Sequence, residues 1–284
     1  MADSKEKIGV VGAGLMGAEI ALVHALAGHD VLLSDRSDNI LGAALGRLKE
    51  ILEKGVARGF WTAEAADPTM ARIAATPDLA RFADRDVVVE AVFENEQVKA
   101  DLFKTLDKTC GPNTLFCTNT SSIAISTLAS YVAPQRRPFF IGTHYFSPVS
   151  RMKLVEIIPA FDTAEATVAA ATRLATAIGK TPIRVKDVVG FAVNRVLTAF
   201  LIEAVKLVEE GVATPADIDQ ACRLGLGHPM GPFELMDAIS SSLALEVQEI
   251  CFNAYGERFR PPALMKQMVK AGRTGRKAGK GWRV

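Results

Sequence analysis

Up to about residue 185, short apolar runs rich in β-branched residues alternate with stretches that have the periodicity of helices. The runs at 7–12, 30–35, 86–92, 114–120, 139–144, 153–159 and 181–186 predict strands. Helices are expected between the first of these predicted strands, at 15–27, 40–57 and 97–107. The predicted strands are apolar on both faces, which is typical of parallel strands covered by helices on each side. The alternation therefore predicts βαβ units with right-handed crossovers.

After residue 187 the strand-like runs give way to helical periodicity alone. One helix is expected to span 194–210 and to stop at Gly211. The next is expected to start with a Thr214 cap and Pro215 and to end on Gly225. The segments 231–250 and 261–272 complete an all-helical second half. The sequence thus predicts an α/β domain at 1–187 and a helical domain at 188–284.

Three glycines mark the junction of the first strand and the first helix in IGVVGAGLMGAEIA. Gly12 permits a tight turn, Gly14 lets a pyrophosphate approach the backbone, and Gly17 allows close packing of helix on strand. Leu15 and Met16 belong to the same loop, and the helix N-terminus supplies N–H groups for phosphates. The structural alternative is a generic glycine-rich turn.

The second predicted strand ends in Asp35, 18 residues after Gly17. An acidic residue at this place accepts hydrogen bonds from the adenosine ribose and repels a 2′-phosphate. Together with the glycine loop it predicts a Rossmann-type domain that binds NAD. Arg36, the next residue, keeps NADP open as an alternative.

Charge and composition exclude several classes of partner. The 284 residues carry 33 Lys and Arg against 32 Asp and Glu, a formal net charge of +1, so nothing in the overall charge attracts nucleic acid or an anionic membrane. The N-terminal residues lack the pattern of a signal peptide, and no transmembrane segment is expected. The four cysteines are scattered without metal-ligand spacing, which predicts reduced thiols, no metal site and a cytoplasmic location.

His144 and Glu156 lie within HYFSPVSRMKLVEII, and together they suggest acid–base chemistry. His144 ends a predicted strand, and Glu156 interrupts the next apolar run. If the two strands pair antiparallel across the turn, the carboxylate can lie beside the imidazole, fix its tautomer and stabilise the imidazolium. Two alternatives remain open: a histidine that is only hydrogen-bonded, and a glutamate on a solvent-facing edge.

Several motifs in a fixed order resemble one family. They are VGAGLMG, VVEAVFENEQVKADLF, NTSSI, GTHYFSPVSRMKLVEII, GFAVNR, LGLGHPMGPFELMD and GRKAGKGW. Over nearly its whole length the chain resembles the L-3-hydroxyacyl-CoA dehydrogenases, above all the short, single-function bacterial 3-hydroxybutyryl-CoA type. The resemblance implies NAD, an acyl-CoA substrate, a homodimer formed through the helical domain, and an active site in a cleft between the domains.

The resemblance also implies roles for individual residues. His144 is the catalytic base, Glu156 orients it, and Ser121 and Asn194 contact the substrate. The cofactor-binding residues would be the glycine loop and Asp35 together with Glu94, Lys99, Ser121, Ser147 and Lys277. Lys54 and Arg58 could pair with CoA phosphates. The structural alternatives are a helix cap for Asn194 and surface positions for Lys99 and Lys277.

The chain departs from the family pattern in three places. Ser147 stands where many members have Asn, and AISSSLA follows GPFELMD where a Gly-Leu-Asp turn is usual. Phe60 and Trp61 are unusual in the segment that meets CoA, and we expect an apolar contact under the helical hairpin in preference to stacking on adenine.

The predicted function is oxidation of a short (3S)-3-hydroxyacyl-CoA. One alternative is the same chemistry on a non-CoA hydroxy acid, carnitine-like alcohol, sugar acid or diketo ester. Another is a non-catalytic protein that retains the cofactor site.

Overall fold

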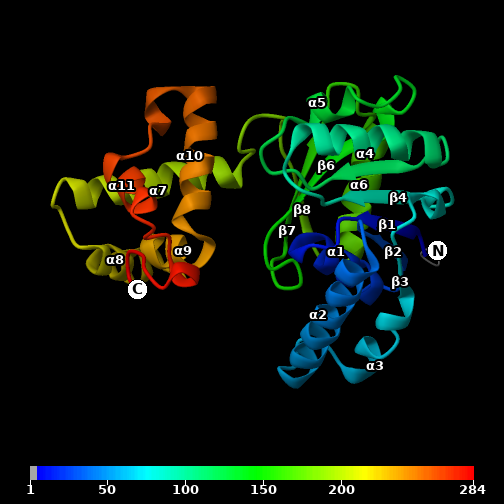
Figure 1. Cartoon of the computed structure of the whole chain (residues 1–284), viewed down its shortest axis with the longest axis horizontal. Helices are drawn as coiled ribbons and strands as arrows, with labels where there is room; N and C mark the ends of the chain where they lie inside the picture. Colours follow the sequence, from blue (N-terminus) through cyan, green and yellow to red (C-terminus); the bar gives the residue numbers. More distant parts are fainter. Residues whose placement is uncertain (1–4) are drawn as a thin grey trace. The chain divides into compact units, whose positions relative to one another are not determined.

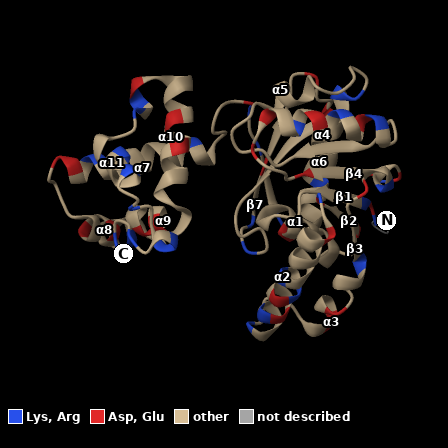
Figure 2. Cartoon of the chain, viewed as in Figure 1, with Lys and Arg blue, Asp and Glu red and all other residues tan. Residues whose placement is uncertain are grey.

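The computed structural model describes residues 5–284, which form two compact units (Figure 1). The first unit ends at Asp187 and the second is Val188–Val284. No helix in the described part of the chain is both long and apolar enough to cross a membrane. Figure 2 shows acidic and basic residues interspersed along helices such as α2 and α4, in keeping with the balanced net charge.

The first unit contains one eight-stranded sheet in the order β3-β2-β1-β4-β5-β6-β7-β8. Its strands are β1 (Lys7–Val11), β2 (Asp30–Ser34), β3 (Ile73–Thr76), β4 (Val87–Glu90), β5 (Leu115–Thr118), β6 (Phe140–Tyr145), β7 (Leu154–Pro159) and β8 (Thr181–Arg184). All neighbouring strands are parallel except β6 and β7, which pair antiparallel. The predicted α/β class is confirmed. β3, at one edge of the sheet, was not expected from the sequence.

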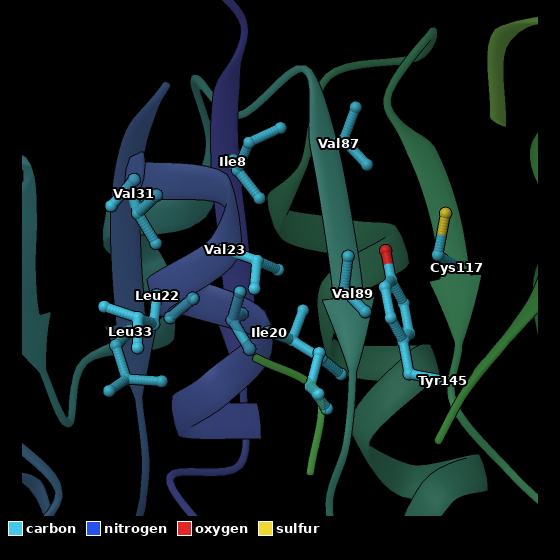
Figure 3. Packing of buried hydrophobic residues seen from close by; sticks show 14 of the residues in the cluster. Ile8, Ile20, Leu22, Val23, Val31, Leu33, Val87, Val89, Cys117 and Tyr145 are labelled. Atoms are coloured by element: carbon cyan, nitrogen blue, oxygen red, sulfur yellow. The ribbon is translucent and has the colours of Figure 1, made fainter. Parts of the chain in front are cut away.

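The helices of the first unit are α1 (Leu15–Leu26), α2 (Asp38–Ala57), α3 (Ala63–Ala66), α4 (Glu96–Thr109), α5 (Ile125–Ala129) and α6 (Glu165–Ala177). Helix α1 is apolar nearly all round and packs on the sheet. Figure 3 shows Ile8, Val31 and Val87 of neighbouring strands near Ile20 and Val23 of α1. Burying each such side chain contributes roughly 1.5–3 kcal/mol, so this contact fixes the helix that carries the glycine loop.

The second unit is helical, as predicted. It contains α7 (Val193–Glu209), α8 (Pro215–Leu226), α9 (Pro232–Ile239), α10 (Ser241–Tyr255) and α11 (Ala263–Lys270). The Thr214 side chain caps α8 and Pro215 is its first residue, as expected. The predicted end at Gly225 is wrong: α8 continues to Leu226, because Gly227 is the residue that adopts the left-handed conformation, with φ 70°.

The segment AISSSLA, which departs from the family pattern, contains the end of α9 and the start of α10. Ser240 lies between them with φ 88°, a conformation that non-glycine residues rarely adopt. Its hydroxyl accepts a hydrogen bond from the N–H of Ser242 at 3.3 Å. A serine thus occupies a backbone position that glycine adopts with less strain.

We expect Ser240→Gly to raise the free energy of unfolding by about 1 kcal/mol, because it removes a strained Cβ atom at the cost of one cap bond. Ser240→Ala is the matched control, since it removes the same hydroxyl and keeps the Cβ atom. Urea denaturation of the three chains should give the order Gly, Ser, Ala. An alanine variant more stable than the glycine variant would refute the strain.

Candidate active site

The glycine loop between β1 and α1 has the geometry of a pyrophosphate site. Gly12 has φ 104°, and a Cβ atom there would lie 2.4 Å from the carbonyl oxygen of Ala91. A Cβ atom at Gly17 would lie 1.8 Å from the carbonyl oxygen of Gly12, so only glycine permits this approach of helix to loop. At Gly14, the N-cap of α1, a Cβ atom would meet no described atom within 4 Å. The loop therefore presents free space at a helix N-terminus, where an anion is favoured.

A pocket of about 270 Å³ adjoins this loop and holds Asp35 and Arg36 among its lining residues. Asp35 accepts hydrogen bonds from the N–H groups of Ala13 and Arg36, both at 2.7 Å. Each carboxylate oxygen can accept a further bond. These residues fit the adenosine end of NAD, with Asp35 placed for the ribose hydroxyls.

We expect Asp35→Ser to raise the KM for NAD by about tenfold, because bonds to a charged acceptor contribute roughly 1.5–3 kcal/mol. The KM for NADP should fall, since the carboxylate no longer repels the 2′-phosphate. Steady-state kinetics with both cofactors and one hydroxyacyl substrate measure the change, and Asp162→Ser, an exposed carboxylate after β7 that does not line this pocket, is the control. An unaltered ratio between the two cofactors would count against this assignment.

His144 and Glu156 come together as the sequence predicted. They are directly opposite each other in the antiparallel register of β6 and β7, and His144 Nδ1 lies 2.7 Å from Glu156 Oε2. Both side chains are buried, Glu156 completely. The alternative of a solvent-facing edge for Glu156 is wrong, because β8 covers that side of β7. A completely buried carboxylate beside an imidazole is suited to holding one tautomer and stabilising the imidazolium.

The neighbouring residues fix the position of this pair. The N–H of Tyr145, the residue after His144, donates to Asn119 Oδ1 at 2.8 Å, which ties the end of β6 to the loop after β5. His24, a second buried histidine, lies 3.4 Å from the Tyr145 hydroxyl. Burial lowers the pKa of His24 to about 3, with smaller contributions from His29 and Lys180, so it stays neutral. Asn119 was not singled out in the sequence, although it lies in the NTSSI motif.

Glu94 organises the loop that carries Ser121. Its Oε1 atom accepts hydrogen bonds from Thr120 Oγ1 at 2.5 Å, from the N–H groups of Ser121 and Ser122 at 2.9 Å, and from Ser122 Oγ at 2.9 Å. Burial opposes its ionisation, but Lys99 and these donors outweigh burial, so the pKa of Glu94 lies below its ordinary value. Glu94 and Ser121 are thus brought together at the carboxyl end of β5.

The structural alternative for Lys99, a surface position without a role in the site, is wrong. Its side chain is 1% exposed, and Nζ lies 2.5 Å from Glu90 Oε1 and 3.2 Å from Glu94 Oε2. Glu90, the last residue of β4, also accepts from Thr118 Oγ1 at 2.5 Å. Sequence reasoning missed Glu90, although it interrupts an apolar strand just as Glu156 does. Burial raises the pKa of Glu90, although Lys99 and Thr118 act in the opposite sense. The contacts of Lys99 with both carboxylates hold the end of β4 and the Glu94 loop together.

Other predicted site residues are not joined to these networks by any described contact. Ser147 is exposed in the loop after β6, and Lys54 and Arg58 are exposed at the end of α2, where Lys54 pairs with Glu50 at 3.0 Å. Asn194 is the second residue of α7, whose N-cap is Ala192, so Asn194 is not the cap. Lys277 is exposed in a short 3-10 helix of the second unit.

The two unusual aromatic residues differ in their surroundings. Trp61 packs against Gly55 of α2, where a Cβ atom would lie 2.0 Å from the indole ring, so the expected apolar contact under the hairpin is present. Phe60 is 44% exposed and lies beneath the guanidinium of Arg151, 4.2 Å from the ring centroid.

The Rossmann-type sheet, the glycine loop, Asp35 and the buried His144–Glu156 pair define a dinucleotide-dependent dehydrogenase of alcohols. Residues 7–188 match the model of the 3-hydroxyacyl-CoA dehydrogenase NAD-binding domain, and residues 190–284 match that of the C-terminal domain. The chain belongs to the 3-hydroxyacyl-CoA dehydrogenase family, and its first unit is the NAD-binding domain.

Individual relatives are similar over the whole chain. A probable 3-hydroxybutyryl-CoA dehydrogenase of Deinococcus radiodurans is 42% identical, over 97% of this chain and 99% of the relative. The solved (S)-3-hydroxybutyryl-CoA dehydrogenase of Ralstonia eutropha is 36% identical, with a TM-score of 0.93 over 98% of both chains. A solved diketoreductase that acts on dicarbonyl compounds is 27% identical, with a TM-score of 0.85 over 98% of both chains.

Proposed function

We propose that the chain interconverts a short (3S)-3-hydroxyacyl-CoA, such as 3-hydroxybutyryl-CoA, and the corresponding 3-oxoacyl-CoA with NAD. The observation that carries this proposal is the buried 2.7 Å contact between His144 and Glu156, in the same unit as the NAD site. The names of the bacterial relatives support the choice of a four-carbon CoA thioester.

In oxidation, His144 removes the proton of the C3 hydroxyl group. Because Nδ1 contacts Glu156, the proton passes to Nε2. The Glu156 carboxylate stabilises the imidazolium, and the C3 carbon becomes a carbonyl carbon. NAD, when bound, accepts the hydride that leaves C3. In reduction, His144 returns the proton to the carbonyl oxygen as the general acid.

We propose the remaining roles from the family pattern and the contacts of each residue. Ser121 and Asn194 contact the substrate, and Glu94 and Lys99 support the cofactor side by holding the loop of Ser121. Ser147 and Lys277 contact the cofactor. The exposed amine and guanidinium of Lys54 and Arg58 pair with CoA phosphates.

A second candidate function keeps the hydride chemistry and dispenses with CoA. The similarity to the diketoreductase over 98% of the chain favours it, since that relative acts on dicarbonyl compounds. Its substrates would be diketo esters or free 3-oxo acids.

A comparison of substrates by NADH absorbance tests the proposal. The panel contains 3-oxoacyl-CoA thioesters of four to sixteen carbons, acetoacetate and a diketo ester. We expect the highest kcat/KM with acetoacetyl-CoA. Turnover of the free acid or the diketo ester alone would replace the CoA assignment with the second candidate, and NADH binding without turnover of any substrate would favour a non-catalytic protein.

We propose that the chain forms a homodimer through its helical unit and acts in the cytoplasm. Val196, Leu224, Leu226 and Leu243 of that unit are each at least half exposed, which supports an apolar contact with a second copy. The four cysteines are buried and unpaired, which supports a reducing compartment. Light scattering of the purified protein tests the dimer.

A further inference from the structure

A second pocket in the first unit is lined by basic residues that the site described above does not use. It has a volume of about 360 Å³ and lies among the C-terminal ends of α1 and α6, Trp61 and the loop between β6 and β7. Arg151, Lys153 and Lys180 line it, and its described lining contains no Asp or Glu. Figure 2 shows basic residues on the loop that leads into β7.

A buried lysine and a half-buried glutamate hold this loop in place. Lys180 Nζ donates hydrogen bonds to the carbonyl oxygen of Val149 and, at 2.7 Å, to that of Met152. From the other side, the N–H of Ser150 donates to Glu19 Oε2 of α1 at 2.7 Å. The backbone that carries Arg151 and Lys153 is therefore fixed before any ligand arrives, which lowers the entropy cost of binding.

None of the three cations forms an ion pair with a described carboxylate. Within residues 5–284, none of Arg151, Lys153 and Lys180 lies within 4.0 Å of a carboxylate oxygen. Burial holds the pKa of Lys180 below its ordinary value, although Glu19 acts in the opposite sense. The Arg151 guanidinium rests on the Phe60 ring, which keeps it beside the pocket. Lys180 is bound to the loop carbonyls, whereas Arg151 and Lys153 form no ion pair, so their positive charges beside one pocket attract an anion.

We propose that this pocket binds a phosphate group of the acyl-CoA substrate, with Arg151 and Lys153 as its donors. A guanidinium and an ammonium are the groups that bind phosphate oxygens most strongly. The loop that presents them begins directly after His144 and Tyr145, so the reacting end and the phosphate end of one substrate meet the same segment. The inference rests on the proposed CoA substrate, because a free acid has no phosphate.

The test compares acetoacetyl-CoA with acetoacetyl-pantetheine, a thioester that lacks the phosphates. We expect Arg151→Gln/Lys153→Gln to raise the KM for acetoacetyl-CoA about tenfold, as loss of bonds to a charged group implies. The KM for acetoacetyl-pantetheine, the KM for NADH and kcat should stay unchanged. Both side chains are exposed, so the variant should fold normally. Lys104→Gln/Lys108→Gln on α4 removes the same charge elsewhere and should leave all four parameters unchanged.

The other possible results of this test would overturn either the phosphate pocket or the proposed function. An unchanged KM for acetoacetyl-CoA, or an equal rise for both thioesters, overturns the phosphate pocket while the proposed function stands. Inorganic phosphate distinguishes a separate anion: if the double variant loses inhibition by phosphate but keeps its KM for acetoacetyl-CoA, the CoA assignment of the pocket is wrong. If the unaltered chain reduces neither thioester, the proposed function fails and the pocket assignment falls with it.

Discussion

We expect His144→Gln to lower kcat with acetoacetyl-CoA and NADH by roughly 10²-fold or more, the range for loss of a general acid–base group. Glutamine can still donate a hydrogen bond to Glu156, so the two strands should keep their register. It cannot exchange a proton at neutral pH. Steady-state kinetics measure kcat, and NADH fluorescence should show unchanged cofactor binding, because the glycine loop and Asp35 are unaltered.

His228→Gln is the matched control. His228 lies in the loop between α8 and α9 of the second unit, with its ring 5.4 Å from that of Phe200. Its replacement should leave kcat nearly unchanged. Full activity of the His144 variant, or an equal loss in both variants, would contradict the assignment of the base.

Glu156→Gln should lower kcat by roughly 10-fold to 100-fold, because the imidazolium loses the charge that stabilises it while the imidazole itself remains. The amide keeps the shape of the side chain, so urea denaturation should show little change in stability. Glu165→Gln is the control, since that exposed carboxylate pairs with Arg184 on the surface and should not affect kcat.

The double variant His144→Gln/Glu156→Gln separates a positioning role from an independent one. If Glu156 acts only through His144, the double variant should be no slower than His144→Gln alone, because residues that act as a unit are not additive. Losses that multiply would show that Glu156 acts on the substrate or cofactor by itself.

The sequence was sufficient to predict the main elements because their patterns were long or carried clear end signals. β3 was missed, since Ile73–Thr76 is short, contains two alanines and follows a helical segment. The end of α8 was misplaced because Gly225 and Gly227 are both plausible caps, and only the backbone shows which of them adopts the left-handed conformation.

Within the site, the antiparallel pairing of β6 and β7 could be predicted because a single loop without helical periodicity, residues 146–153, joins two apolar runs. The partners of Lys99 could not, since they depend on how β4 and α4 pack in three dimensions. A usable signal existed, however: Glu90 is a carboxylate in an apolar strand, and such a charge needs a buried partner. Glu90 and Lys99 are therefore a buried charge and its partner, as Glu156 and His144 are.

The reduction of acetoacetyl-CoA by NADH, with the configuration of the product determined by chiral analysis, tests the central claim most directly. We predict that one (3S)-3-hydroxybutyryl-CoA forms for each NADH consumed, and that acetoacetate is reduced far more slowly. No NADH consumption with acetoacetyl-CoA, in a chain that reduces acetoacetate or a diketo ester, would contradict it.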